Sequence, residues 1–297
     1  MSDVGDDTPT WRVALRMCVA AALACFLGHR GLKKQSLDKS GALAALFVGF
    51  FSLASGYRFG VLLLGFYFSG SKLTKVRANV KLQLDANYKV GGQRSAQQVL
   101  ACSLLATGIA VYYMQHFGDR DAPIHFSKAP VQSFLLASYI GHYACCAADT
   151  WASELGVLSK SSPRLITTLR KVPPGTNGAV SGLGLAASAL GGAFIGVLYF
   201  ISSLFTSTAQ PQVILLGTTM GLFGSVLDSI LGATLQSTWF DKTTKKICAE
   251  GTRKPKKSAE AQEHVCGIDV LTNEQVNVVS VVVATIASGY IAQAIFS

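Results

Sequence analysis

Two aspartates stand in stretches where charged residues are otherwise rare. Asp149 ends the predicted span 131–149, within ACCAADTWASELG, and Asp228 lies within GLFGSVLDSILGATLQ. Ionisable side chains in such apolar surroundings are costly and tend to mark function. We take both as candidate catalytic and metal-binding residues, with Glu154 as a third metal ligand, because Mg²⁺ binds a few carboxylates beside waters and substrate phosphates. A structural alternative is that Asp149 caps a helix and Asp228 hydrogen-bonds a neighbouring one.

The loop between the two aspartates carries cations and glycines. From Ser159 to Gly182 it reads SKSSPRLITTLRKVPPGTNGAVSG. A glycine-rich turn directly before a helix offers free backbone N–H groups and the positive end of the helix dipole, which favour phosphate. The pattern is not a Walker loop, since GxxxxGK[ST] is absent from the chain. A plain turn with topogenic charges is the alternative. The candidate phosphate-binding residues are Lys160, Arg164, Arg170, Lys171, Gly175, Thr176, Asn177 and Gly178.

Polar residues also gather at three other predicted helix ends. One segment begins FSGSKLTK, a second is GGQR, and a third is LTNEQVN. A spacing of three or four places two side chains on one helical face. An amphipathic surface segment would show the same spacing. The further candidate phosphate contacts are Lys72, Lys75, Gln93, Arg94, Asn273 and Asn277.

Long charge-free runs must position these residues. Half of the 297 residues are hydrophobic and 14% are charged, whereas about a quarter are charged in soluble domains. Disorder is excluded, and runs long enough to cross a bilayer predict an all-α, multi-pass integral membrane protein. The predicted spans are 12–28, 41–55, 59–71, 96–115, 131–149, 179–205, 211–232 and 276–296. The second and third spans form either a tight hairpin or one bent helix.

About eight transmembrane helices would give one domain over 12–297, behind a polar tail at 1–11. Most of the 26 Lys and Arg then fall on one side, which the positive-inside rule makes cytosolic. The cytosolic loops lie near 72–95, 150–178 and 236–275, and both termini are non-cytosolic. The endoplasmic reticulum is the default expectation for a membrane protein that lacks a transit peptide.

The net charge of +10 follows from topogenic loops, and such loops also attract anionic lipid heads and phosphates. Nucleic acid is not an expected partner, because no finger spacing or aromatic-basic module is present. Cys248, Cys266 and His264 fall short of the four ligands of a zinc site. The oligomeric state is open.

Seven blocks in order resemble the transmembrane protein 19 family over about 37–297. They are FSGSKLTK, GGQR, ADTWASELG, SKSSPRLITT, PPGTNGAVS, GSVLDSILGATLQ and LTNEQVN. Relatives in that family include the plant and cyanobacterial phytyl-phosphate kinase. A looser similarity links the chain to CTP-dependent polyprenol kinases and phosphatidate cytidylyltransferases. That similarity implies that Asp149 and Asp228 are the paired acids and that Ser162-Pro163-Arg164 lies in the nucleotide-phosphate loop. The H-G-G-x-x-D-R-x-D ending of the cytidylyltransferases is absent.

The residues and the resemblance together predict a Mg²⁺-dependent phosphotransferase. It would use CTP to phosphorylate a membrane-embedded isoprenoid monophosphate, phytyl or prenyl, to the diphosphate at the cytosolic face. The alternatives are a transporter, for which intramembrane acids are also expected, and a non-catalytic lipid-binding membrane protein. The identity of the prenyl chain and of the nucleotide stays open.

Overall fold

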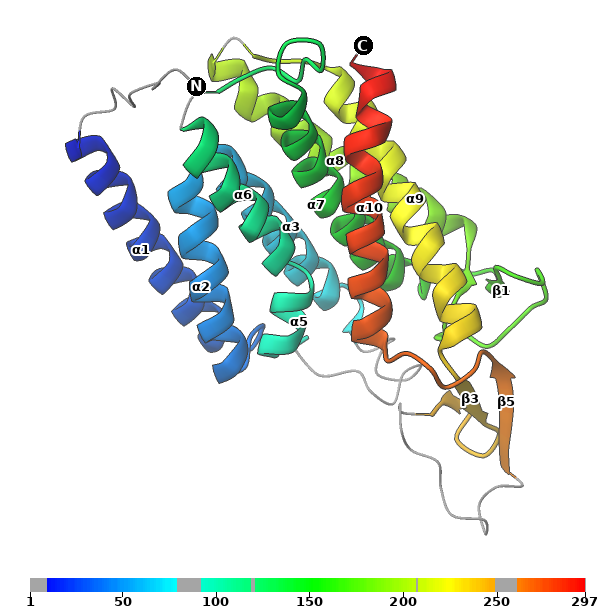
Figure 1. Cartoon of the computed structure of the whole chain (residues 1–297). Coiled ribbons are helices and arrows are strands. Elements are labelled where there is room, and N and C mark those ends of the chain that lie inside the picture. Colours follow the sequence, from blue (N-terminus) through cyan, green and yellow to red (C-terminus); the bar gives the residue numbers. More distant parts are fainter. Residues whose placement is uncertain (1–9, 79–91, 119–120, 207, 249–260, 297) are drawn as a thin grey trace.

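The computed structural model describes residues 10–78, 92–118, 121–206, 208–248 and 261–296. Its longer helices lie side by side along one axis, and α1 begins at the end of the bundle where α10 finishes (Figure 1). The strands lie at the opposite end. The helices are α1 (Thr10–Lys33), α2 (Lys39–Ser55), α3 (Tyr57–Lys75), α5 (Ala96–Ala101), α6 (Leu104–Phe117), α7 (Pro130–Gly156), α8 (Gly182–Ser203), the short η1 (Leu204–Thr206), α9 (Gln212–Leu235) and α10 (Asn273–Ile295).

Each predicted span coincides with a helix, and one of them is broken. The span predicted at 96–115 divides at Cys102 into α5 and α6. Among the described residues, four helices have the length and composition to cross a membrane by themselves, namely α1, α8 with η1, α9 and α10. The total of eight crossings therefore stays a prediction. Residues 1–9 of the predicted polar tail lie outside the described residues, and its last two begin α1.

The all-α prediction was incomplete, because two small sheets occupy segments predicted as loops. In the first, β1 (Arg164–Leu165) pairs antiparallel with β2 (Ala179–Val180). The second has the order β4-β3-β5, from β4 (Lys246–Ile247), β3 (Thr238–Asp241) and β5 (Gln262–Cys266). Backbone groups in long loops need hydrogen-bond partners, and the pairing supplies them. The predicted loops at 72–95 and 150–178 also began too early, since α3 runs to Lys75 and α7 to Gly156.

The second and third predicted spans form a hairpin. Gly56 joins α2 to α3 with φ 152° and ψ 149°, a conformation in the region that favours glycine. At the far ends of the two helices, Ser36 Oγ lies 2.9 Å from Tyr67 Oη. This contact requires α3 to run back along α2, so the bent single helix is excluded.

Helix α7 lies at the centre of the bundle, and its residues from Leu136 to Ala148 are buried. His142, fully buried within it, lies 3.0 Å from Thr285 Oγ1 of α10 and 2.9 Å from the carbonyl oxygen of Cys102. A helix break inside a bilayer frees carbonyl groups that need a partner. His142 supplies that partner at the α5–α6 break, next to the site described below.

Helices α8 and α9 approach closely through glycines. A Cβ added at Gly192 would lie 2.3 Å from the carbonyl oxygen of Gly217, and one at Gly196 would lie 2.6 Å from that of Val213. Small residues at such crossings let helix backbones meet in a membrane. The two helices are thereby fixed to one another along Gly192, Gly196 and Gly217.

Gly192→Ala is expected to lower the melting temperature of the protein in detergent, because the new methyl group forces α8 away from α9. Gly108→Ala is the matched control, since nothing lies within 4 Å of the added Cβ. Alanine favours a helix over glycine by about 1 kcal/mol at either position. The difference between the variants therefore isolates the clash, and equal melting temperatures would contradict the tight crossing.

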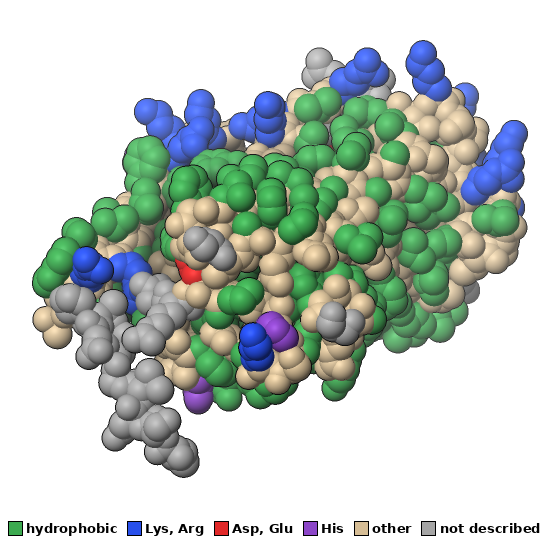
Figure 2. All heavy atoms as spheres, turned by 90° about the horizontal axis from the view of Figure 1, so that it is seen from above, with side chains coloured by type: hydrophobic (Ala, Val, Ile, Leu, Met, Phe, Trp, Pro, Cys, Tyr) green, Lys and Arg blue, Asp and Glu red, His purple; other side chains and the backbone are tan. Residues whose placement is uncertain are grey.

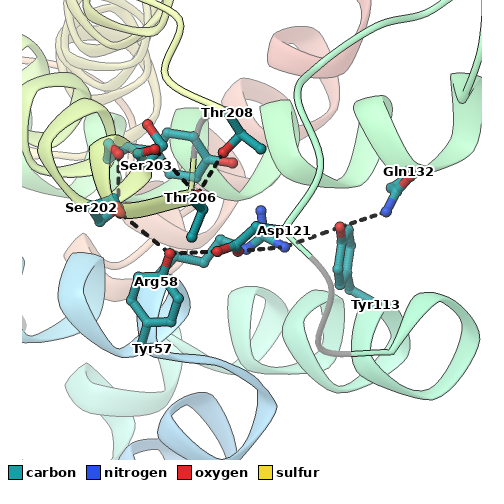
Figure 3. A network of polar contacts seen from close by, with 10 residues as sticks. Tyr57, Arg58, Tyr113, Asp121, Gln132, Ser202, Ser203, Thr206 and Thr208 are labelled. Carbon is teal, nitrogen blue, oxygen red and sulfur yellow. Dashed lines mark hydrogen bonds and ion pairs between the residues drawn. The ribbon is translucent and has the colours of Figure 1, made fainter. Parts of the chain in front are cut away.

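A polar network lies at the end of the bundle where α1 begins. Arg58 Nη2 lies 3.2 Å from Asp121 Oδ1 and donates to Tyr113 Oη at 3.2 Å, and Tyr57 Oη donates to Asp121 at 2.5 Å (Figure 3). Seen from this end, hydrophobic and uncharged groups cover most of the surface, and Lys and Arg stand mainly at its rim (Figure 2). The ion pair is thus an exception on a largely uncharged face.

Candidate functional site

A cavity of about 530 Å³ lies among the helix ends nearest the strands. Its polar part receives side chains from α7, α9 and α10 and from two loops. Chain segments far apart in sequence meet there, as the predicted site required. The polar lining includes Arg94, Asp149, Glu154, Gly175, Thr176, Asn177, Gly178, Asp228, Asn273, Glu274 and Asn277.

The other part of the same cavity is apolar. It is bounded by α1, α2 and α3, and its residues carry no charge. They are Ala24, Leu27, Gly28, Ala45, Val48, Gly49, Leu63, Leu64 and Phe66. The cavity is therefore amphiphilic, with carboxylates at one part and aliphatic and aromatic groups at the other.

Asp149 and Asp228 lie on the neighbouring helices α7 and α9. Their carboxylates are half-buried and both line the cavity. Ser280 of α10 donates to Asp228 Oδ2 at 3.2 Å. This bond fixes one carboxylate oxygen of Asp228 against α10.

The glycine turn lies against α9. Gly175 and Gly178 have φ of +88° and +71°, values that favour glycine. A Cβ at Gly178 would lie 2.3 Å from the carbonyl oxygen of Ser229, so only glycine allows this approach. The contact brings Asn177 beside the helix turn that holds Asp228.

The turn differs from the prediction in how it meets the next helix. Strand β2 intervenes, and α8 begins at Gly182 with Ser181 as its N-cap, whose Oγ accepts from Gly184 N at 3.1 Å. Two amides of the turn are used inside the protein, because Thr176 N donates to Pro173 O at 3.3 Å and Asn177 N to Thr238 Oγ1 at 3.3 Å. The turn is therefore a fixed wall of the cavity and not an open nest that runs directly into a helix.

Arg94 lines the cavity, and hydrogen bonds of its backbone to the segment before α2 fix its position. Its amide donates to Ser36 O at 3.1 Å, its carbonyl accepts from Asp38 N at 3.0 Å, and Nη1 donates to Ser71 Oγ at 3.1 Å. Among the basic residues that the structure describes, Arg94 alone lines this cavity. Gln93, Lys72 and Lys75 are exposed and do not line it.

The four cations of the loop between the aspartates lie outside the cavity. Lys160 and Lys171 are exposed. Arg164 Nη1 donates to Leu169 O at 2.7 Å, and Arg170 Nη2 donates to Val265 O. Arg164 thus bonds a carbonyl of its own loop and Arg170 bonds a carbonyl of β5, which holds both side chains away from the acids. Arg164 and Lys171 line a separate, smaller depression beside the start of α8.

The predicted metal trio does not form a cluster. Within the described part of the chain, no three His, Cys, Asp or Glu side chains are grouped so as to hold a metal ion. Glu154 Oε1 accepts from Thr74 Oγ1 at 2.6 Å. Mg²⁺ takes one or two carboxylates and completes its shell with waters and substrate phosphates. Asp149 and Asp228, with nearby amide oxygens, form a hard oxygen donor set that fits this ion.

The thiol and imidazole weighed for zinc face backbone atoms. Cys266 Sγ lies 3.5 Å from Asn177 O, and His264 Nε2 lies 2.8 Å from Gly267 O. Burial raises the pKa of the Cys266 thiol, which keeps it protonated, whereas a zinc ligand is a thiolate. Cys266 instead holds the glycine turn against the small sheet.

Several residues that line the cavity were not predicted from the sequence. Ser225 lies three residues before Asp228, and that spacing alone places the two on one face. Glu274 lies inside LTNEQVN, between the two predicted asparagines. The others come from chain segments that only the fold brings together, and carried no pattern of their own. The lining residues that the predicted site did not include are, among others, Gln98, Cys102, Ser103, Ser225, Ser229, Gln236 and Glu274.

These features define a multi-pass integral membrane protein whose helices enclose an amphiphilic cavity. The chain belongs to the family described as integral membrane protein DUF92, whose model matches residues 22–285. It is 38% identical to Protein PGR of Arabidopsis thaliana over 287 residues, 93% of this chain and 97% of that protein. The family assignment agrees with the resemblance carried by the seven sequence blocks.

Two further relatives are more distant. An uncharacterized membrane protein of Methanocaldococcus jannaschii is 30% identical over 230 residues, which is 76% of this chain and 86% of that protein. Protein VTE6, chloroplastic, of Arabidopsis thaliana is 29% identical over 231 residues, 77% of this chain and 64% of that protein. No solved structure matches the chain significantly.

Proposed function

We propose that this protein transfers the terminal phosphate of CTP to an isoprenoid monophosphate, with Mg²⁺. The observation that carries the proposal is the amphiphilic cavity, in which Asp149, Asp228 and Arg94 line the same space as an uncharged apolar part. A substrate with a phosphate head and a hydrocarbon tail matches both parts. The resemblance to the family of the phytyl-phosphate kinase supports the isoprenoid and the reaction.

In the proposed reaction, an oxygen of the isoprenoid phosphate attacks the γ-phosphorus of CTP. The bond from that phosphorus to the bridging oxygen breaks, and CDP leaves. Phosphoryl transfer needs little covalent chemistry from the protein, so positioning and electrostatics dominate. Arg94 is placed to neutralise phosphate charge, and Asn177, Asn273 and Asn277 are placed to orient oxygens of the two substrates.

Asp149 and Asp228 would hold Mg²⁺, whose charge offsets that of the phosphates and so favours transfer. Ser280 donates to Asp228 Oδ2, so Oδ1 is the oxygen that we propose for binding the ion. The apolar residues of α1, α2 and α3 exclude water from the tail, and Pro174 to Gly178 form a wall at the head.

We also propose eight membrane crossings, with the cavity opening to the cytosol and the protein in the endoplasmic reticulum. In support, α1 begins at the end of the bundle where α10 finishes (Figure 1), as an even number of crossings requires. Exposed basic residues gather at the opposite ends of the helices, where the positive-inside rule expects the cytosol. Examples are Lys33, Lys34, Lys39, Lys72, Lys75 and Lys160.

The test uses protein purified in detergent, geranylgeranyl or phytyl monophosphate, and CTP labelled at the γ-phosphate. Labelled isoprenoid diphosphate is the expected product, and chelation of Mg²⁺ with EDTA is expected to abolish it. A CTP-induced rise in melting temperature distinguishes the proposed enzyme from a carrier of unrelated solutes, whose melting temperature should not change with CTP. No diphosphate from any prenyl monophosphate, with any nucleoside triphosphate, would overturn the proposal.

A non-catalytic lipid-binding protein is the second candidate. It is favoured by the single basic side chain, Arg94, that the described residues bring to the cavity, because two phosphorylated substrates carry more negative charge than one arginine offsets. Such a protein would bind the isoprenoid phosphate without turnover, so binding measured in the same preparation distinguishes the two candidates.

A further inference from the structure

We propose that four small residues, Ala24 and Gly28 of α1 and Ala45 and Gly49 of α2, set the length of the isoprenoid chain that the cavity accepts. This inference rests on the proposed function, because it assigns the apolar part of the cavity to the substrate's tail. It goes further in naming the residues that make the substrate specific.

The four residues line the cavity, and two of them, Gly49 and Ala24, lie well away from the helix ends that carry its polar part. Gly49 is ten residues from Lys39, the first residue of α2, so it lies about 15 Å along the helix at a rise of about 1.5 Å per residue. Ala24 is nine residues from Lys33, the last residue of α1. A tail whose head lies at Arg94 therefore runs toward α1 and α2.

Helix packing does not require glycine at these positions. A Cβ at Gly28 would lie 3.5 Å from Ala42 O, and one at Gly49 would lie 3.6 Å from Ala24 Cβ, both ordinary van der Waals contacts. At Gly192 and Gly217, by contrast, a Cβ would lie within 2.5 Å of backbone oxygen. The small size of Gly28 and Gly49 thus leaves volume in the cavity and is not needed to let the helices meet.

This wall of the cavity is also the edge of the bundle. Helix α1 packs mainly on α2, and its other faces carry exposed apolar side chains such as Leu15, Leu23 and Phe26. Among the described residues, α1 therefore forms the outer wall of the cavity on this side. Larger side chains on α1 and α2 would therefore shorten the cavity from its tail end and leave Asp149, Asp228 and Arg94 in place.

The experiment measures binding, without nucleotide, of geranyl, farnesyl and geranylgeranyl monophosphate by calorimetry on the full chain in detergent. The variants are Gly49→Leu and Ala45→Phe. The control is Leu43→Phe, because Leu43 is on α2, is 71% exposed and does not line the cavity. Each methylene displaced from the cavity weakens binding about fourfold, so loss of two methylenes or more is expected to weaken binding of the longest chain at least about tenfold in both variants. Binding of the shortest chain should change by less than about twofold, and melting temperatures report folding.

The outcomes separate this inference from the phosphotransferase activity. A shift of the binding preference toward shorter chains, without any diphosphate formation, supports the inference and rules out the proposed kinase activity. Turnover with an unchanged chain-length profile in two folded variants overturns the inference alone. If the unsubstituted protein binds none of the three monophosphates, both fail. If a variant does not fold, Gly28→Val replaces it, and an unchanged profile there overturns the inference.

Discussion

Asp149→Asn is expected to lower the rate of isoprenoid diphosphate formation by at least about 100-fold, the scale of losing one preorganised electrostatic contact in an active site. The amide keeps the size of the carboxylate but not its charge, and of the two proposed metal ligands only Asp228 then keeps its charge. Binding of the isoprenoid monophosphate without Mg²⁺ should be unchanged or tighter, because a negative charge next to the head has gone. Opposite effects on turnover and binding indicate a metal role for Asp149.

The matched control is Asp269→Asn, since Asp269 is an exposed acid outside the cavity. It should retain full activity. Rates are compared per folded protein, from the size-exclusion profile and the melting temperature. Full turnover in Asp149→Asn would show that the carboxylate does not take part in the reaction. Asp149 would then have only a structural role in α7.

The sequence predicted the helices well because lipid imposes one simple constraint. Charge-free runs must satisfy their own backbone groups, so all eight became helices close to their predicted positions. The break at Cys102 could not be predicted, because its carbonyl is stabilised by His142, forty residues away. The two small sheets were missed for a related reason, since their short strands pair across loops that periodicity alone does not describe.

The sequence predicted some residues of the candidate site correctly and others wrongly, depending on where they lie in the fold. Acids and asparagines on helices lined the cavity, since a buried polar group in an apolar helix has few places to point. The cations of the exposed loop do not line the cavity, because a long side chain on a loop can reach many other partners. Arg164 instead bonds the carbonyl of Leu169 in its own loop, and Arg170 bonds that of Val265 in β5. Arg94 reached the cavity through backbone pairing with Ser36 and Asp38, which spacing could not reveal.

Arg58→Met is expected to destabilise the protein by about 3–5 kcal/mol, the usual cost of leaving one member of a buried ion pair without its partner. The side chains of Arg58 and Asp121 are 6% and 11% exposed, and 3.2 Å separates their charged atoms. Without the guanidinium, Asp121 keeps the hydroxyl of Tyr57 but loses the ion-pair partner that the described residues give it (Figure 3). Thermal unfolding in detergent measures the loss.

Removing both charges should restore most of that stability, since a buried pair replaced by uncharged groups costs far less than a broken one. In Arg58→Met/Asp121→Asn the melting temperature should lie well above that of Arg58→Met alone. Lys128→Met, an exposed residue, is the control and should melt like the unsubstituted protein. Because the network lies at the end of the bundle away from the cavity, folded protein of every variant should bind isoprenoid monophosphate equally. Weaker binding per folded molecule would instead mean that the ion pair acts on the cavity through α3 and α7, the helices that contact both.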